Sequence, residues 1–130
     1  MKIHHIGYLV KDIGQSVTQF EQIGFMLAGE FVRDGIRKVD IVFLKNGDYT
    51  IELISPYEST SVVASLIPKY KNTAYHFCYE TESIFQEINR LEKKGYKVID
   101  KPEVAPAIAN CYTVFLTHPK LGLIELVEIQ

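Results

Sequence analysis

Apolar residues recur at helical spacing in two segments of the chain. In each segment three of them stand at positions i, i+4 and i+7, the spacing of a helix with one apolar face. A residue that can cap the helix N-terminus comes directly before each stripe, and a glycine follows where a left-handed residue would end the helix. The two sets are Asp12, Ile13, Val17, Phe20 and Gly24, and Ser83, Ile84, Ile88, Leu91 and Gly95.

Apolar runs of strand length surround both predicted helices. One run precedes each helix and three follow it, and turn-forming residues such as Asn46-Gly47-Asp48 separate the last two runs. One helix followed by a run of three strands in each half predicts an α+β fold. In the first half the runs cover residues 4–10, 25–33, 39–44 and 49–54, and in the second half 74–80, 96–99, 111–117 and 123–129.

The two halves are copies of one βαβββ unit. A shift of 71 residues takes His5 to His76 and Gly24 to Gly95, and shifts of 72 and 73 align the later strands. A lone unit would expose one face of its sheet, so we expect the two curved sheets to close around a shared cleft, with the helices outside. We assign one domain, 1–130, made of repeat 1 (about 1–56), a connector with a short helix near 62–70 (about 57–73) and repeat 2 (about 74–130).

Strand alternation places one histidine and one glutamate of each repeat on the inner face. Their apolar neighbours cover the helices, so His5 and Glu52 in repeat 1 point the other way, as do His76 and Glu125 in repeat 2. A lone histidine at a strand start is usually structural, but here the same two residue types recur at matched positions. Two imidazoles and two carboxylates suit one divalent ion, such as Zn, Co, Mn or Ni. The neighbours expected under the helices include Phe77 and Tyr79.

Other polar residues are weaker candidates. We expect structural roles for His4 and for Cys78, the latter as a small buried hydrophobe, and we assign no role to His118. We expect Lys69 and Lys71 to be ordinary solvated charges, which could meet a phosphate group if the substrate carries one.

Charge and composition narrow the choice of partner. The 14 basic and 16 acidic residues give a net charge of −2 with no block of like charges, which argues against nucleic acid and an anionic membrane surface as partners. A mean hydropathy of +0.02 is ordinary for a globular protein. The two cysteines need not pair, and no signal sequence or apolar span is evident, so we expect a reduced, cytoplasmic setting. A small molecule is the partner that these observations leave open.

At these residues the sequence resembles the vicinal oxygen chelate superfamily, which has the glyoxalase and bleomycin-resistance fold. Methylmalonyl-CoA epimerases are the members to which it is most similar. The resemblance spans nearly the whole chain in the family's order and spacing. The segments that carry it are residues 4–13, 51–56, 75–80, 114–116, 118–120 and 123–126.

The resemblance implies a metal-dependent enzyme that moves a proton next to a carbonyl group. His5, His76 and Glu125 then correspond to metal ligands, and Glu52 to a further, more variable ligand. The family's metal chelates vicinal oxygens of the substrate and stabilises an enolate while carboxylates move the proton. Glu125 and Glu52 are the candidates for that transfer, and Asp40 is a weaker one. An acyl-CoA substrate and a homodimer are also implied.

Three alternatives use the same fold. A glyoxalase I-like lactoylglutathione lyase would act on a hemithioacetal with the same ligands. An extradiol dioxygenase needs two histidines and one carboxylate, so a fourth ligand at Glu52 argues against it. A binding protein of the drug-resistance kind needs no metal, so the four-residue set argues against it as well.

The sequence departs from the epimerase pattern in one loop. The loop at 102–110 lacks the glycine and histidine that epimerases usually carry before the seventh strand.

Overall fold

A computed structural model describes residues 1–129, and the chain forms two compact units. The first unit contains His5–Tyr75. The second contains Met1–His4 together with the chain from His76 onward. The short N-terminal segment belongs to the second unit, where the carbonyl oxygen of Lys2 accepts a hydrogen bond of 2.8 Å from the Glu80 amide.

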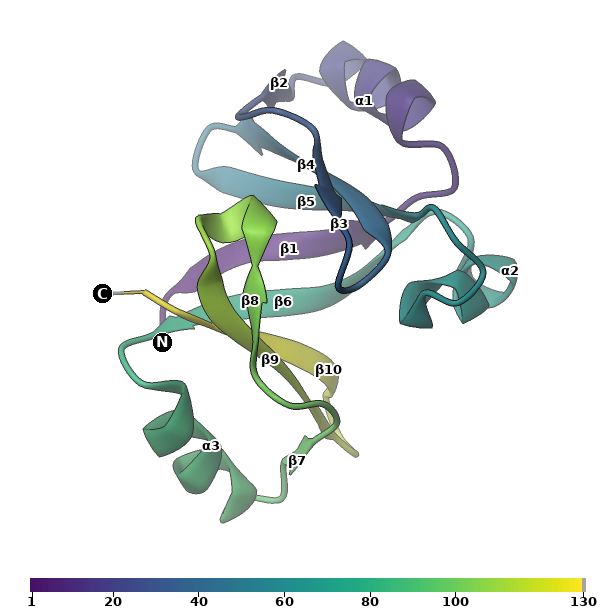
Figure 1. The fold of residues 1–130 in the computed structure, drawn as a ribbon. Helices are drawn as coiled ribbons and strands as arrows, with labels where there is room; N and C mark the ends of the chain where they lie inside the picture. Colours follow the sequence, from purple (N-terminus) through teal and green to yellow (C-terminus); the bar gives the residue numbers. More distant parts are fainter. Residues whose placement is uncertain (130) are drawn as a thin grey trace. The chain divides into compact units, whose positions relative to one another are not determined.

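The first unit packs one helix on a mixed sheet (Figure 1). Neighbouring strands follow the order β2-β4-β5-β1, and β3 also pairs with β4. The β1–β5 pair is parallel, and the pairs that β4 makes are antiparallel. The elements are β1 (Ile3–Leu9), α1 (Ile13–Gln22), β2 (Met26–Leu27), β3 (Val32–Asp34), β4 (Val39–Asn46), β5 (Tyr49–Pro56), the 3-10 helix η1 (Val62–Ser65) and α2 (Ile67–Tyr70).

The second unit repeats this topology, so the predicted α+β architecture of two related units is confirmed. Its strands follow the order β6-β10-β9-β7, with β8 also paired to β9. The β6–β10 pair is parallel, as its counterpart β1–β5 is. The elements are β6 (Thr73–Thr81), α3 (Ile84–Glu92), β7 (Lys97–Val98), β8 (Glu103–Ala105), the 3-10 helix η2 (Pro106–Ile108), β9 (Cys111–His118) and β10 (Gly122–Glu128).

Both long helices begin at the predicted caps. The Asp12 carboxylate accepts a hydrogen bond of 2.9 Å from the Gln15 amide, and the Ser83 hydroxyl accepts one of 3.3 Å from the Gln86 amide. Each satisfies an amide that the first helical turn leaves without a partner. Gly24 follows α1 with φ of +106°, a backbone conformation that favours glycine.

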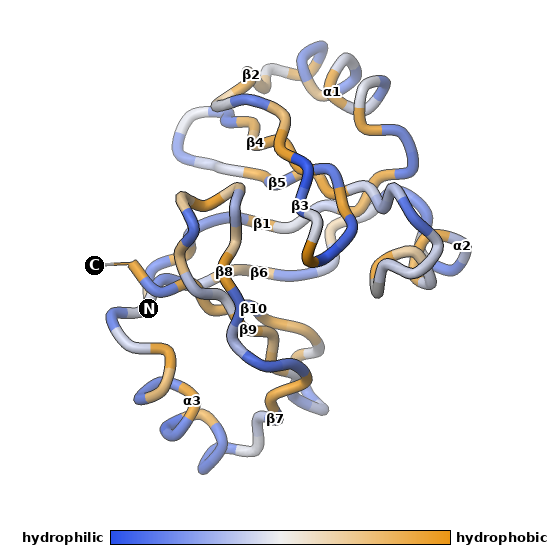
Figure 2. The backbone as a smooth tube through the Cα atoms, viewed as in Figure 1, coloured by the Kyte–Doolittle hydropathy of each residue, from blue (hydrophilic) through white to orange (hydrophobic). Residues whose placement is uncertain are grey.

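A separate apolar core lies between helix and sheet in each unit. Figure 2 shows hydrophobic and hydrophilic segments alternating along α1 and α3, as expected for helices with one buried face. Tyr79 packs against the core of the second unit. Phe77 lies on the same sheet face, as predicted, but it is 45% exposed, so the helix does not cover it as expected. The cores are Val10, Val17, Val42, Leu44, Ile51 and Leu53 in the first unit, and Ile84, Leu91, Val114, Leu116, Ile124 and Leu126 in the second.

Three predicted elements have different bounds in the structure. The strand predicted at 25–33 is two short strands, β2 and β3, separated by a segment that contains Gly29, a residue type that weakens a strand. The loop at 102–110 contains β8 and η2, because residues 103–105 pair with β9. The helix predicted near 62–70 is split into η1 and α2, since Pro68 is tolerated only in a first helical turn. None of the helices in the described residues combines the length and apolarity needed to cross a bilayer.

Candidate metal centre

In the first unit, His5 of β1 and Glu52 of β5 point to the same side of the sheet. Glu52 is the Cα partner of Gly7 in the parallel β1–β5 pair, and His5 stands two residues before Gly7. Alternation along the strand therefore puts both side chains on the face opposite the helix. The His5 Nε2 lies 3.4 Å from the Glu52 Oε1, and both residues are buried.

The second unit repeats this arrangement with His76 of β6 and Glu125 of β10. Glu125 is the Cα partner of Cys78, and His76 stands two residues before Cys78. The His76 Nε2 lies 3.2 Å from the Glu125 Oε1, and both residues are buried. The register, the atom pair and the burial match those of the first unit.

Each histidine ring also contacts a phenylalanine edge to face. The Phe43 ring lies 5.3 Å from the His5 ring at an interplanar angle of 79°. The Phe115 ring lies 5.1 Å from the His76 ring at 89°. Phe43 is the Cα partner of Glu52, and Phe115 is that of Glu125. Sequence reasoning missed both phenylalanines, although the shift of 72 residues that aligns β4 with β9 also aligns them.

The donor atoms in each unit suit a divalent cation. A buried carboxylate is costly unless a positive charge or several hydrogen-bond donors compensate it. An imidazole nitrogen and a carboxylate oxygen facing each other, away from the apolar core, provide the nitrogen and oxygen ligands that first-row divalent metals accept. The structure thus places each predicted histidine beside the predicted glutamate of its own repeat.

Comparison with known proteins identifies the family. A sequence model of the Glyoxalase/Bleomycin resistance protein/Dioxygenase superfamily matches residues 3–115. The chain belongs to this superfamily.

The superfamily relatives cover the chain almost completely. An ethylmalonyl-CoA/methylmalonyl-CoA epimerase of Cereibacter sphaeroides is 28% identical over 133 residues, which are 99% of this chain and 96% of the relative. A hypothetical protein of Bacillus halodurans has a structure with a TM-score of 0.85 and 27% identity, over 99% of this chain and 94% of that one. A methylmalonyl-CoA epimerase of Streptomyces coelicolor, solved with 2-nitronate-propionyl-CoA, has a TM-score of 0.81 and 23% identity, over 98% and 96%. At 23% identity, the similarity to the Streptomyces coelicolor structure shows a shared fold only.

Asp40, the weaker candidate for proton transfer, lies on the face of β4 opposite that of Glu52 and His5. Phe43 shares the side of Glu52, so Asp40, three residues away, faces the same side as the helix-covered core. Its carboxylate accepts hydrogen bonds of 2.8 Å and 3.1 Å from the Nε and Nη2 of Arg33. The hydrogen bond to Asp40 raises the pKa of Arg33. Asp40 is therefore an ion-pair partner, and its assignment as an acid or base is corrected.

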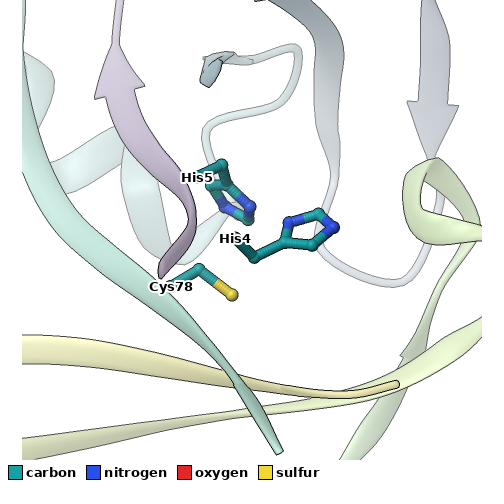
Figure 3. Close-up of side chains that lie close together, drawn as sticks. All are labelled: His4, His5 and Cys78. Carbon is teal, nitrogen blue, oxygen red and sulfur yellow. The ribbon is translucent and has the colours of Figure 1, made fainter. Parts of the chain in front are cut away.

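Cys78 and His4 lie close together in the second unit (Figure 3). A ring nitrogen of His4 is within 4.8 Å of the Cys78 sulfur. Cys78 is fully buried, in agreement with the small-hydrophobe role expected of it, and neither it nor Cys111 forms a disulfide.

His118 has a structural role in the turn between β9 and β10. Its Nδ1 accepts a hydrogen bond of 3.0 Å from the Lys120 amide, and its ring centroid lies 4.6 Å from that of Tyr96. We expect His118→Ala to lower the free energy of unfolding by about 1 kcal/mol, because one hydrogen bond and one ring contact are lost. Urea denaturation measures this change. Metal content measured on the same variant should stay at the wild-type value, and its loss would contradict a purely structural role.

Proposed function

We propose that this chain is a metal-dependent enzyme that moves a proton at the carbon next to a thioester carbonyl, as an acyl-CoA epimerase does. The observation that carries the proposal is the buried His–Glu contact present at matched positions in both units. Membership of the superfamily and the epimerase relative that matches 99% of the chain support it.

The proposed metal ligands are the two His–Glu pairs. His5 and Glu52 supply one nitrogen and one oxygen, and His76 and Glu125 supply the equivalent atoms, for a single divalent ion such as Zn, Co, Mn or Ni. When bound, such an ion polarises the carbonyl oxygen of the substrate and stabilises the negative charge that develops there. The repeat in the sequence supports a shared ion, since it supplies the same two ligand types twice at matched positions.

The two glutamates are the proposed proton carriers. Epimerisation removes a proton from one face of the carbon and returns one to the other face, so it needs a base and an acid on opposite sides. Glu52 and Glu125 are related by the repeat, and each is buried on its sheet face away from the core. Each carboxylate lies beside the Nε2 of the histidine in its own unit, at 3.4 Å for Glu52 and 3.2 Å for Glu125. A single carboxylate would exchange the proton without inverting the carbon.

Solvent deuterium exchange tests the reaction. When methylmalonyl-CoA is incubated with the wild-type protein in deuterium oxide, we expect deuterium to be incorporated at the α carbon. Mass spectrometry of the substrate measures this incorporation. A hemithioacetal assay on the same sample distinguishes the epimerase from a lactoylglutathione lyase, for which the same donor set is suitable. Turnover of the hemithioacetal alone would assign the lyase reaction in place of the epimerase reaction. The absence of activity in both assays would refute both reactions.

A further inference from the structure

We infer that Phe43 and Phe115 are positioning residues that fix the orientation of the two histidine rings for metal binding. This inference rests on the proposed metal site. It assigns the two phenylalanines a role that differs from core packing, and it predicts that metal affinity depends on side chains that supply no ligand atom.

The geometry at each site restrains the histidine from two sides. In the first unit, Glu52 faces the His5 Nε2 while the Phe43 ring stands nearly perpendicular to the imidazole. Rotation of the imidazole about its bond to Cβ would break both contacts. A ring held in this way has little rotamer freedom left to lose when Nε2 takes a ligand position.

The phenylalanine is also fixed relative to the glutamate. Phe43 is directly opposite Glu52 on the antiparallel β4–β5 pair, and Phe115 is directly opposite Glu125 on β9–β10. Side chains opposite each other on one sheet face are in contact range. Each phenylalanine therefore contacts the histidine of its His–Glu pair and stands within contact range of the glutamate.

Core packing does not account for this recurrence. Phe43 and Phe115 are only partly buried, and they stand on the sheet face opposite the core clusters, which consist of other residues. The two ring contacts match within 0.2 Å in centroid separation, from 5.3 to 5.1 Å. The same aromatic residue recurs where the same two candidate ligands recur.

Calorimetric titration with Co²⁺ tests the inference on the purified full chain. We expect Phe43→Leu and Phe115→Leu each to weaken Co²⁺ binding by about tenfold, the lower end of the effect of removing a residue that orients a metal ligand. The visible absorption spectrum of bound Co²⁺ should also change, because it reports ligand geometry. Phe43→Tyr keeps the ring and should retain the wild-type affinity.

Phe20→Leu is the matched control. Phe20 makes edge-to-face contacts of 5.1 Å with Tyr8 and 5.2 Å with Phe25, but on the helix side of the sheet. The Phe20→Leu substitution should lower the Tm of the metal-free protein and leave the Co²⁺ affinity unchanged. Wild-type affinity in both leucine variants would overturn the positioning role alone. Absence of Co²⁺ binding by the wild-type protein would refute the metal site, and this inference with it.

Discussion

After incubation with Zn²⁺ or Co²⁺ and dialysis, the wild-type protein should retain about one divalent ion per chain, and the His5→Ala, His76→Ala double variant should retain none. The double variant removes both nitrogen ligands and leaves two buried carboxylates, Glu52 and Glu125, without their imidazole partners. Elemental analysis gives the metal content directly. Equal, negligible content in the two proteins would eliminate the proposed site.

Thermal unfolding provides a second readout of the same prediction. An ion that binds only the folded chain adds about 2.7 kcal/mol to its stability at a free concentration one hundred times Kd. The Tm of the wild-type protein should therefore rise when the ion is added, and that of the double variant should not. His118→Ala is the control variant, because it removes a histidine that is not a proposed metal ligand. The Nδ1 of His118 accepts a hydrogen bond from the Lys120 amide in a turn.

Stoichiometry separates a shared ion from two independent ones. If each His–Glu pair bound its own ion, wild-type protein would hold about two ions, and His5→Ala would lose only one of them. If the two pairs share one ion, as proposed, either single variant weakens the same binding event. A titration that ends near one equivalent in the wild-type protein supports sharing.

Much of the fold could be predicted because its signals are local. The stripe at Ile13 and Val17, and the caps at Asp12 and Ser83, depend on residues within a few positions of one another. The match between His5 and His76 needed only the repeat. Strand alternation then assigned the histidines and glutamates to one face of each sheet, and the structure has each His beside its Glu.

The features that sequence reasoning missed depend on strand register. The face on which Asp40 lies follows from its alternation relative to Phe43, and Phe43 is placed only by its pairing with Glu52. A one-residue slip in register would exchange the two faces, and the sequence pattern of β4 alone does not exclude that slip. For the same reason the contact between Phe43 and His5 became visible only in the structure.

Replacement of a proposed proton carrier should have the largest effect on the reaction. We expect Glu52→Gln and Glu125→Gln each to reduce epimerisation of methylmalonyl-CoA by about 10²–10⁴-fold, the usual contribution of a general acid or base. Glutamine keeps the size of the side chain and an oxygen donor, but it takes up no proton at neutral pH. Metal analysis of each variant shows how much of the change comes from altered metal content.

Single epimers of the substrate test the two roles separately. A variant that retains one carboxylate removes and returns the proton on one face only, so it should incorporate deuterium into one epimer without inverting it and leave the other epimer unlabelled. The two variants should label opposite epimers. Glu58→Gln is the control, because the hydrogen bond from Lys38 lowers the pKa of Glu58 and the substitution removes an ionised carboxylate that is exposed. Labelling of both epimers by both Glu52→Gln and Glu125→Gln would show that other residues carry the proton.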